Sequence, residues 1–178
     1  MEITQKWCKL ESVCANSPCY WGPCKYPCAH ISFAGSKWLM TLNGKEVFGD
    51  VDTTQIPVIT CGPQLVINAE DIPMDAFHLG MPEFTVEHCR QIDDFVKTHQ
   101  TATFVVNCQA GISRSCALWA GLVLQYHKMP MAKMWGHIVK NNGSPNQHIF
   151  ALYCDYAHVM AYDVAVAETT AFWKRYLV

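Results

Sequence analysis

One stretch organises this sequence: Val105-Val106-Asn107-Cys108-Gln109-Ala110-Gly111-Ile112-Ser113-Arg114-Ser115. Five residues with a glycine at their centre separate Cys108 from Arg114. An apolar run precedes this loop and a longer apolar run follows it. A loop between a strand and a helix N-terminus can cradle a tetrahedral oxyanion, because its backbone N–H groups point inward and the helix dipole favours negative charge. The stretch therefore predicts an oxyanion-binding loop.

The residues on either side predict the elements that hold the loop. Thr103-Phe104-Val105-Val106 is a continuous apolar run, as expected for a central strand buried on both faces. Ser115 to Tyr126 is apolar almost all round, which predicts the most buried helix of the chain. Residues 85–99 carry apolar side chains at helical spacing, with Thr85 as a plausible N-cap and Glu87 near the positive end of the helix dipole. The order around the loop is helix, strand, loop, helix.

The first part of the chain has the composition of short strands. Five pieces are rich in β-forming residues: 30–34, 37–42, 46–48, 57–60 and 64–68. Asn43-Gly44 lies between two of these pieces and is a strong hairpin signal. The acidic segment 69–75 predicts a loop at a strand end. Residues 1–29 combine prolines with five cysteines, which predicts an irregular packed segment.

The C-terminal half is predicted to be helical. We expect helices at 131–140, from about Ser144, and within 163–178; for the second, Ser144 is the expected N-cap and Pro145 the first helical residue. Strands that alternate with helices, followed by a helical half, predict an α/β domain with a central, mostly parallel sheet flanked by helices. We expect one domain over 1–178, with a cysteine-rich segment at 1–29, a catalytic core at 30–160 and a helical tail at 163–178.

Composition narrows the function. The chain has 178 residues, 51% hydrophobic and 16% charged, as in a compact globular domain. With thirteen Lys+Arg and fifteen Asp+Glu, the chain lacks the excess of positive charge with which proteins bind the phosphates of nucleic acids. No apolar run approaches the roughly 20 residues that span a bilayer, and the first residues lack the pattern of a signal peptide. We expect a cytoplasmic protein with neither nucleic acid nor membrane as partner.

Ten cysteines are a high number for this length. Without a signal for secretion, we interpret them as reduced thiols and not as a disulfide framework. The spacing of Cys19, Cys24, Cys28 and His30 permits a zinc hypothesis, but the paired Cys-x2-Cys knuckles that zinc sites usually show are absent. Small buried thiols are the favoured interpretation, for Cys116 on the apolar helix as well. Trp119 and Trp135 are expected in the core.

The loop contains side chains suited to phosphate chemistry. Cys108 is a candidate nucleophile, since we expect an electropositive loop to favour the thiolate, the reactive form. Arg114 supplies a planar fork that binds two phosphate oxygens at once. Gly111 permits the tight path of the loop. Ser115 can donate a hydrogen bond to the sulfur when the thiolate leaves.

The loop resembles the signature of the cysteine-based protein tyrosine and dual-specificity phosphatases, His-Cys-x5-Arg-Ser/Thr. The run from Cys108 to Ser115 is close to the dual-specificity form, Cys-x-Ala-Gly-x-Ser-Arg-Ser. The resemblance extends from about Pro57 to about His158, with small bacterial-type or dual-specificity-like members the most similar. It implies that the phosphate is bound by Gln109, Ala110, Gly111, Ile112, Ser113 and Arg114.

The resemblance also implies partners for the loop. Asp71 follows the 64–68 strand as the family's general acid follows its strand, but Asp75 competes with it. Asp71 lies 37 residues before Cys108, several more than is usual, and Asp75 lies 33 before it. We prefer Asp71 because it lies at the strand end. Asn146, in Ser144-Pro145-Asn146, matches the asparagine that supports the family's phosphate loop, although it fits an ordinary residue of the helix's first turn equally well.

The implied activity is hydrolysis of phosphotyrosine in proteins, and also of phosphoserine or phosphothreonine, through a phosphocysteine and without a metal or another cofactor. The alternative is a pseudophosphatase that binds phosphoproteins with little turnover. The reason for this alternative is Asn107, because the family usually has histidine at this position. An asparagine could keep a hydrogen bond but would not supply the positive charge. We expect reduced, not absent, activity. Lipid or RNA 5′ phosphates rank lower, because residues 109–113 include no basic residue.

Overall fold

The structure is a computed structural model that describes residues 2–9, 28–34, 39–42, 45–48, 62–71, 83–108 and 111–176. Its elements are β1 (Glu2–Lys9), β2 (Cys28–Ala34), β3 (Leu39–Leu42), β4 (Lys45–Phe48), β5 (Gln64–Asn68), α1 (Val86–Thr98), β6 (Thr103–Cys108), α2 (Arg114–His127), α3 (Met131–Lys140), α4 (Gln147–Tyr156) and α5 (Tyr162–Tyr176). Among the described elements, five strands precede α1 and four helices follow β6, which confirms the predicted α/β class.

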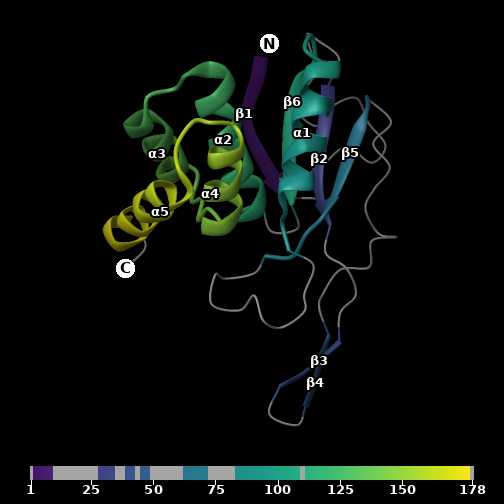
Figure 1. Ribbon diagram of the computed structural model, residues 1–178, viewed down its shortest axis with the longest axis vertical. Helices are drawn as coiled ribbons and strands as arrows, with labels where there is room; N and C mark the ends of the chain where they lie inside the picture. The colour runs from purple at the N-terminus through teal and green to yellow at the C-terminus, as the bar shows by residue number, and fades with distance from the viewer. Residues whose placement is uncertain are drawn as a thin grey trace.

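A four-stranded parallel sheet forms the centre of the fold. Its strand order is β1-β6-β2-β5, so β6 lies between the N-terminal strand and β2 (Figure 1). Every residue of β2 is buried, and β6 is buried except at Val105. A strand that is buried on both faces has a continuous apolar sequence, and residues 103–106 have such a sequence. The Cys108–Arg114 loop follows the C-terminal end of β6, which is one of the two inner strands of this sheet.

Helix α2 is the most buried helix among the described elements. Every residue from Arg114 to Leu124 is buried, as its apolar sequence predicts. It packs against α4, where Gly121 leaves room for the ring of Tyr153. Figure 1 shows α2, α3, α4 and α5 gathered together. The loop is thus fixed between a buried strand and a buried helix.

Several other predicted elements are confirmed. Thr85 is the N-cap of α1, with Glu87 in the first turn. Helix α3 spans 131–140 as expected, and α5 occupies most of the predicted C-terminal tail. β3 and β4 pair in antiparallel register with Leu42 opposite Lys45, as a hairpin with a two-residue connection requires. The Asn43-Gly44 turn itself and the strand predicted at 57–60 lie outside the described residues.

Two predictions were wrong. Residues 1–29 are not irregular throughout, because Glu2–Lys9 forms β1 and β2 begins at Cys28. The polar residues Thr4-Gln5-Lys6 interrupt the apolar pattern of β1, and the register shifts between Ile3 and Trp7, so a continuous strand signal is missing. The N-cap of α4 is Asn146, not Ser144, and Pro145 precedes the helix.

No helix in the described part of the chain is both long enough and apolar enough to cross a membrane.

Candidate active site

Cys108 is the last residue of β6, and Ser115 lies in the first turn of α2. A hydrogen bond of 3.1 Å joins Cys108 Sγ and Ser115 Oγ, and both residues are buried. A hydroxyl at this distance can donate to the sulfur when it carries negative charge. The two side chains therefore lie together where β6 ends and α2 begins.

The loop curls back on the strand that precedes it. Gly111 has a φ of 66°, in the left-handed region where glycine has no steric penalty, and its N–H donates to Cys108 O at 3.2 Å. Ile112 accepts from the N–H of Ser144 at 3.0 Å through its carbonyl, while its side chain is 43% exposed. Gln109 and Ala110, predicted to bind phosphate, lie outside the described residues.

Arg114 is nearly fully buried, at 5% exposed. Its Nη1 donates to the carbonyl oxygen of Ala69 at 2.8 Å, just beyond the end of β5. Its Nε is buried and has no hydrogen-bond partner among the described residues. Because one side of the guanidinium is anchored, the Nε side stays available to an anion. Sequence reasoning missed Ala69, since a backbone acceptor has no residue-type signature.

Asp71 accepts hydrogen bonds from the Cys108–Arg114 loop and from the start of α4. Ser113 Oγ donates to Asp71 Oδ1 at 2.8 Å, and Asn146 Nδ2 donates to the same oxygen at 2.8 Å. These contacts connect the end of β5, the N-terminus of α2 and the N-terminus of α4. The competing aspartate, Asp75, lies outside the described residues.

Asn146 joins three segments. Its Oδ1 accepts from Ile149 N at 3.0 Å and caps α4, its N–H donates to Ser113 O at 3.4 Å, and its Nδ2 reaches Asp71. A capping asparagine has a fixed side-chain orientation, so its amide nitrogen is held toward the Asp71 carboxylate. The sequence offered support of the loop and an ordinary first-turn position as alternatives; in the structure Asn146 contacts the loop and caps the helix.

The hydrogen bonding of Asn107 differs from the expectation that an asparagine at this position keeps a hydrogen bond. Its side chain is fully buried, and neither its oxygen nor its nitrogen has a hydrogen-bond partner among the described residues. Asn107 is paired with Ser32 of β2 in the parallel register. The Ser32 hydroxyl accepts instead from Gln64 Nε2, at 2.9 Å. Asn107 is therefore a polar group buried at an energetic cost.

Cys89, Cys108, Cys116 and Cys154 are free thiols, and each of them is buried. Burial, and secondarily the nearby Cys108, raises the pKa of the Cys116 thiol well above its ordinary value. Cys116 thus stays protonated inside the core. Of the residues in the zinc hypothesis, Cys28 and His30 lie on β2, whereas Cys19 and Cys24 are outside the described residues.

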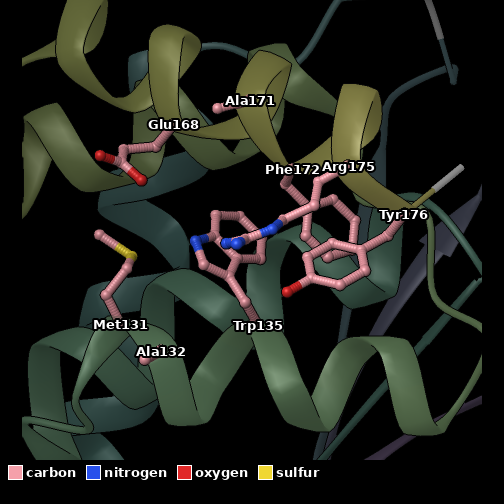
Figure 2. Close-up of a pocket in the computed structure, with 8 residues that line it drawn as sticks. All are labelled: Met131, Ala132, Trp135, Glu168, Ala171, Phe172, Arg175 and Tyr176. Atoms are coloured by element: carbon pink, nitrogen blue, oxygen red, sulfur yellow. The ribbon is translucent and has the colours of Figure 1, made fainter.

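A cavity of about 490 Å³ opens between α3 and α5 (Figure 2). Its walls are Met131, Ala132, Trp135, Glu168, Ala171, Phe172, Arg175 and Tyr176. Trp135, predicted in the core, is only half-buried and stacks on Phe172 with ring centroids 4.7 Å apart. None of the lining residues belongs to the Cys108 loop or contacts Asp71, so this cavity is separate from the candidate active site.

The parallel sheet and the helical C-terminal half form a phosphatase-like α/β fold. Two solved structures of dual-specificity phosphatases share it. A point variant of human DUSP28 has a TM-score of 0.51 and 13% identity, over 85% of this chain and 88% of that one. A mouse protein described as a dual-specificity phosphatase, complexed with zinc tungstate, has a TM-score of 0.52 and 13% identity, over 89% of this chain and 85% of that one.

No protein-family model matches the sequence, and no curated protein matches it. The resemblance to the dual-specificity phosphatases is thus confirmed at the level of the fold.

Proposed function

We propose that this protein hydrolyses phosphate monoesters, with phosphotyrosine in proteins as the main substrate and phosphoserine or phosphothreonine as further substrates. The observation that carries the proposal is the hydrogen bond from Ser113 to Asp71, which spans 42 residues of sequence. It attaches the predicted acid to the loop that begins with the predicted nucleophile. The dual-specificity phosphatase fold supports the same reaction class.

In the first step, the Cys108 thiolate attacks phosphorus, so that a sulfur–phosphorus bond forms while the bond from phosphorus to the ester oxygen breaks. Asp71 gives its proton to the departing oxygen, which leaves as an alcohol or a phenol. The Nε side of Arg114 and the N-terminus of α2 stabilise the charge on the non-bridging oxygens. The product is a phosphocysteine.

In the second step, water attacks the phosphocysteine. Asp71 takes a proton from this water, an oxygen–phosphorus bond forms and the sulfur–phosphorus bond breaks. The Ser115 hydroxyl donates to the sulfur, as the 3.1 Å distance allows, and stabilises the thiolate as it leaves. Inorganic phosphate is released with Cys108 regenerated.

Turnover of p-nitrophenyl phosphate and of a phosphotyrosine peptide tests the proposal. We expect Cys108→Ser to abolish hydrolysis and Asp71→Asn to lower kcat by about 10²- to 10⁴-fold, the usual contribution of a general acid. Asp75→Asn is the matched control and should leave kcat within about threefold of the wild type. A large loss in Asp75→Asn with none in Asp71→Asn would assign the acid to the other aspartate.

Asn107 favours a second candidate, a pseudophosphatase that binds phosphoproteins with little turnover. Its buried amide supplies neither charge nor a hydrogen bond to the residues around Cys108 in the described structure. The two candidates differ in one measurement. A pseudophosphatase binds a phosphotyrosine peptide but releases no phosphate from it, whereas a phosphatase releases phosphate and loses this ability in Cys108→Ser.

A further inference from the structure

The Asp71 carboxylate is held through one of its two oxygens. Ser113 Oγ and Asn146 Nδ2 both donate to Oδ1, each at 2.8 Å. In the part of the chain that the structure describes, no donor contacts Oδ2. A carboxylate fixed at one oxygen keeps the other free to give and take a proton in a constant direction.

The Ser113 hydroxyl is committed to this contact. A serine hydroxyl has a single O–H to donate, and here it is directed at Asp71 and not into the loop. The backbone of Ser113 is fixed as well, because its carbonyl accepts from Ala117 N at 2.9 Å and from Asn146 N at 3.4 Å. The side chain therefore projects from a rigid point at the start of α2.

From this geometry we propose that Ser113 is a positioning residue for the acid, and that it does not bind phosphate through its side chain. This inference rests on the proposed function. The Ser113 hydroxyl and the Asn146 amide together hold Asp71 Oδ1, so that Oδ2 protonates the leaving oxygen and later deprotonates water. Because Ser113 belongs to the loop that holds the phosphate, the acid and the anion share one rigid frame.

The test uses aryl phosphates whose leaving groups differ in acidity. A misplaced acid matters most when the leaving group is a poor one, such as phenol, and least for p-nitrophenol. For Ser113→Ala we expect kcat/KM, which reports the step in which the leaving group departs, to fall at least about tenfold on phenyl phosphate and to stay within about threefold of the wild type on p-nitrophenyl phosphate. Ser113→Thr keeps the hydroxyl and should restore kcat/KM on phenyl phosphate. Thr98→Ala, an exposed hydroxyl on α1, is the control without effect.

A double variant separates positioning from phosphate binding. If Ser113 acts through Asp71, then Ser113→Ala adds nothing to the loss already caused by Asp71→Asn. The inference is overturned if the two losses multiply. It is also overturned if Ser113→Ala raises KM equally for all esters and leaves the dependence on the leaving group unchanged, because the hydroxyl would then be serving the phosphate.

A crystal structure tests the positioning role of Ser113 independently of whether the protein is a phosphatase. Absence of turnover in the wild-type protein contradicts the proposed function, but the position of Asp71 can still be determined. We expect a crystal structure of Ser113→Ala to show the carboxylate displaced from its wild-type position. An unchanged carboxylate, still within hydrogen-bond distance of Asn146 Nδ2, would show that Ser113 does not position it.

Discussion

At the residue scale, Asn107 has the least expected environment in the candidate site. A buried amide without partners costs about 1–3 kcal/mol relative to one that is hydrogen-bonded. Such a cost is tolerated at functional sites more often than elsewhere. The cost is also measurable, since an apolar side chain of similar shape would avoid it.

We therefore expect Asn107→Leu to raise the free energy of unfolding by about 1–3 kcal/mol, because it removes an unsatisfied amide from the interior. Denaturant-induced unfolding measures this change. Asn68→Leu, at an exposed position of β5, is the matched control and should change the free energy of unfolding by less than about 0.5 kcal/mol. If Asn107→Leu instead destabilised the protein by more than about 1 kcal/mol, the amide would have to make a hydrogen bond in solution.

The residues of the loop differ in how far the sequence could predict them. Cys108, Arg114 and Ser115 follow from their spacing, because the spacing itself sets their places at the end of β6 and the start of α2. The contact of Ser113 with Asp71 could not be predicted in this way. It joins positions 42 residues apart and depends on how β5 and α2 meet in three dimensions.

At the element scale, the contact between α2 and α4 is set by two residues, Gly121 and Tyr153. Gly121 is buried in α2, and a Cβ atom at this position would lie 2.5 Å from Cδ1 of Tyr153. Tyr153 is fully buried, and its hydroxyl donates to Gln125 Oε1 at 2.7 Å. The ring therefore has little freedom to move away. Glycine at position 121 serves close packing.

We expect Gly121→Ala to lower the free energy of unfolding by about 1–2 kcal/mol, because the cost of overpacking exceeds the gain in helix propensity. Gly136→Ala on α3 is the matched control, since a Cβ atom there meets nothing within 4 Å. This variant should gain about 0.5–1 kcal/mol from helix propensity alone. Thermal or denaturant unfolding of both variants checks the opposite signs, and the same sign in both would contradict the packing argument.

Long elements with regular patterns were predictable, and short or interrupted ones were not. The continuous apolar sequences of β6 and α2 are difficult to assign to anything other than a buried strand and a buried helix. The start of α4 was placed two residues too early, because Ser144 and Asn146 are both good N-cap residues. The structure decides between them: the Ser144 N–H bonds to Ile112 O, whereas the Asn146 side chain caps Ile149. The competing contact comes from the loop, which local sequence cannot reveal.

At the scale of the whole molecule, a histidine buried in the sheet makes the free energy of unfolding depend on pH. His30 lies on β2 and is 3% exposed. Burial lowers the pKa of its imidazole from 6.5 to about 4. Between these two values the unfolded chain binds more protons than the folded protein does, so stability is full above pH 6.5 and is lost as the pH falls toward 4.

We expect this histidine alone to reduce the free energy of unfolding by about 2 kcal/mol between pH 7.5 and pH 5. Urea unfolding at several pH values measures the slope of the free energy of unfolding against pH for the wild type and for His30→Gln. The slope should be shallower in His30→Gln. Equal slopes in the two proteins would show that His30 does not titrate differently in the folded and unfolded states.

The position of β1 in the sheet has a consequence for how the chain is made. β1 is synthesised before the other described strands, and its sheet partner is β6, with Lys9 opposite Cys108. At roughly 5–20 residues per second, the ribosome needs several seconds to produce the partner after β1 has emerged. During that time the strand has no neighbour in its final place, and its unpaired edge is open to other chains. The pairing of β1 is therefore completed only after residue 108 has left the ribosome, and newly made chains are most prone to aggregate before that point.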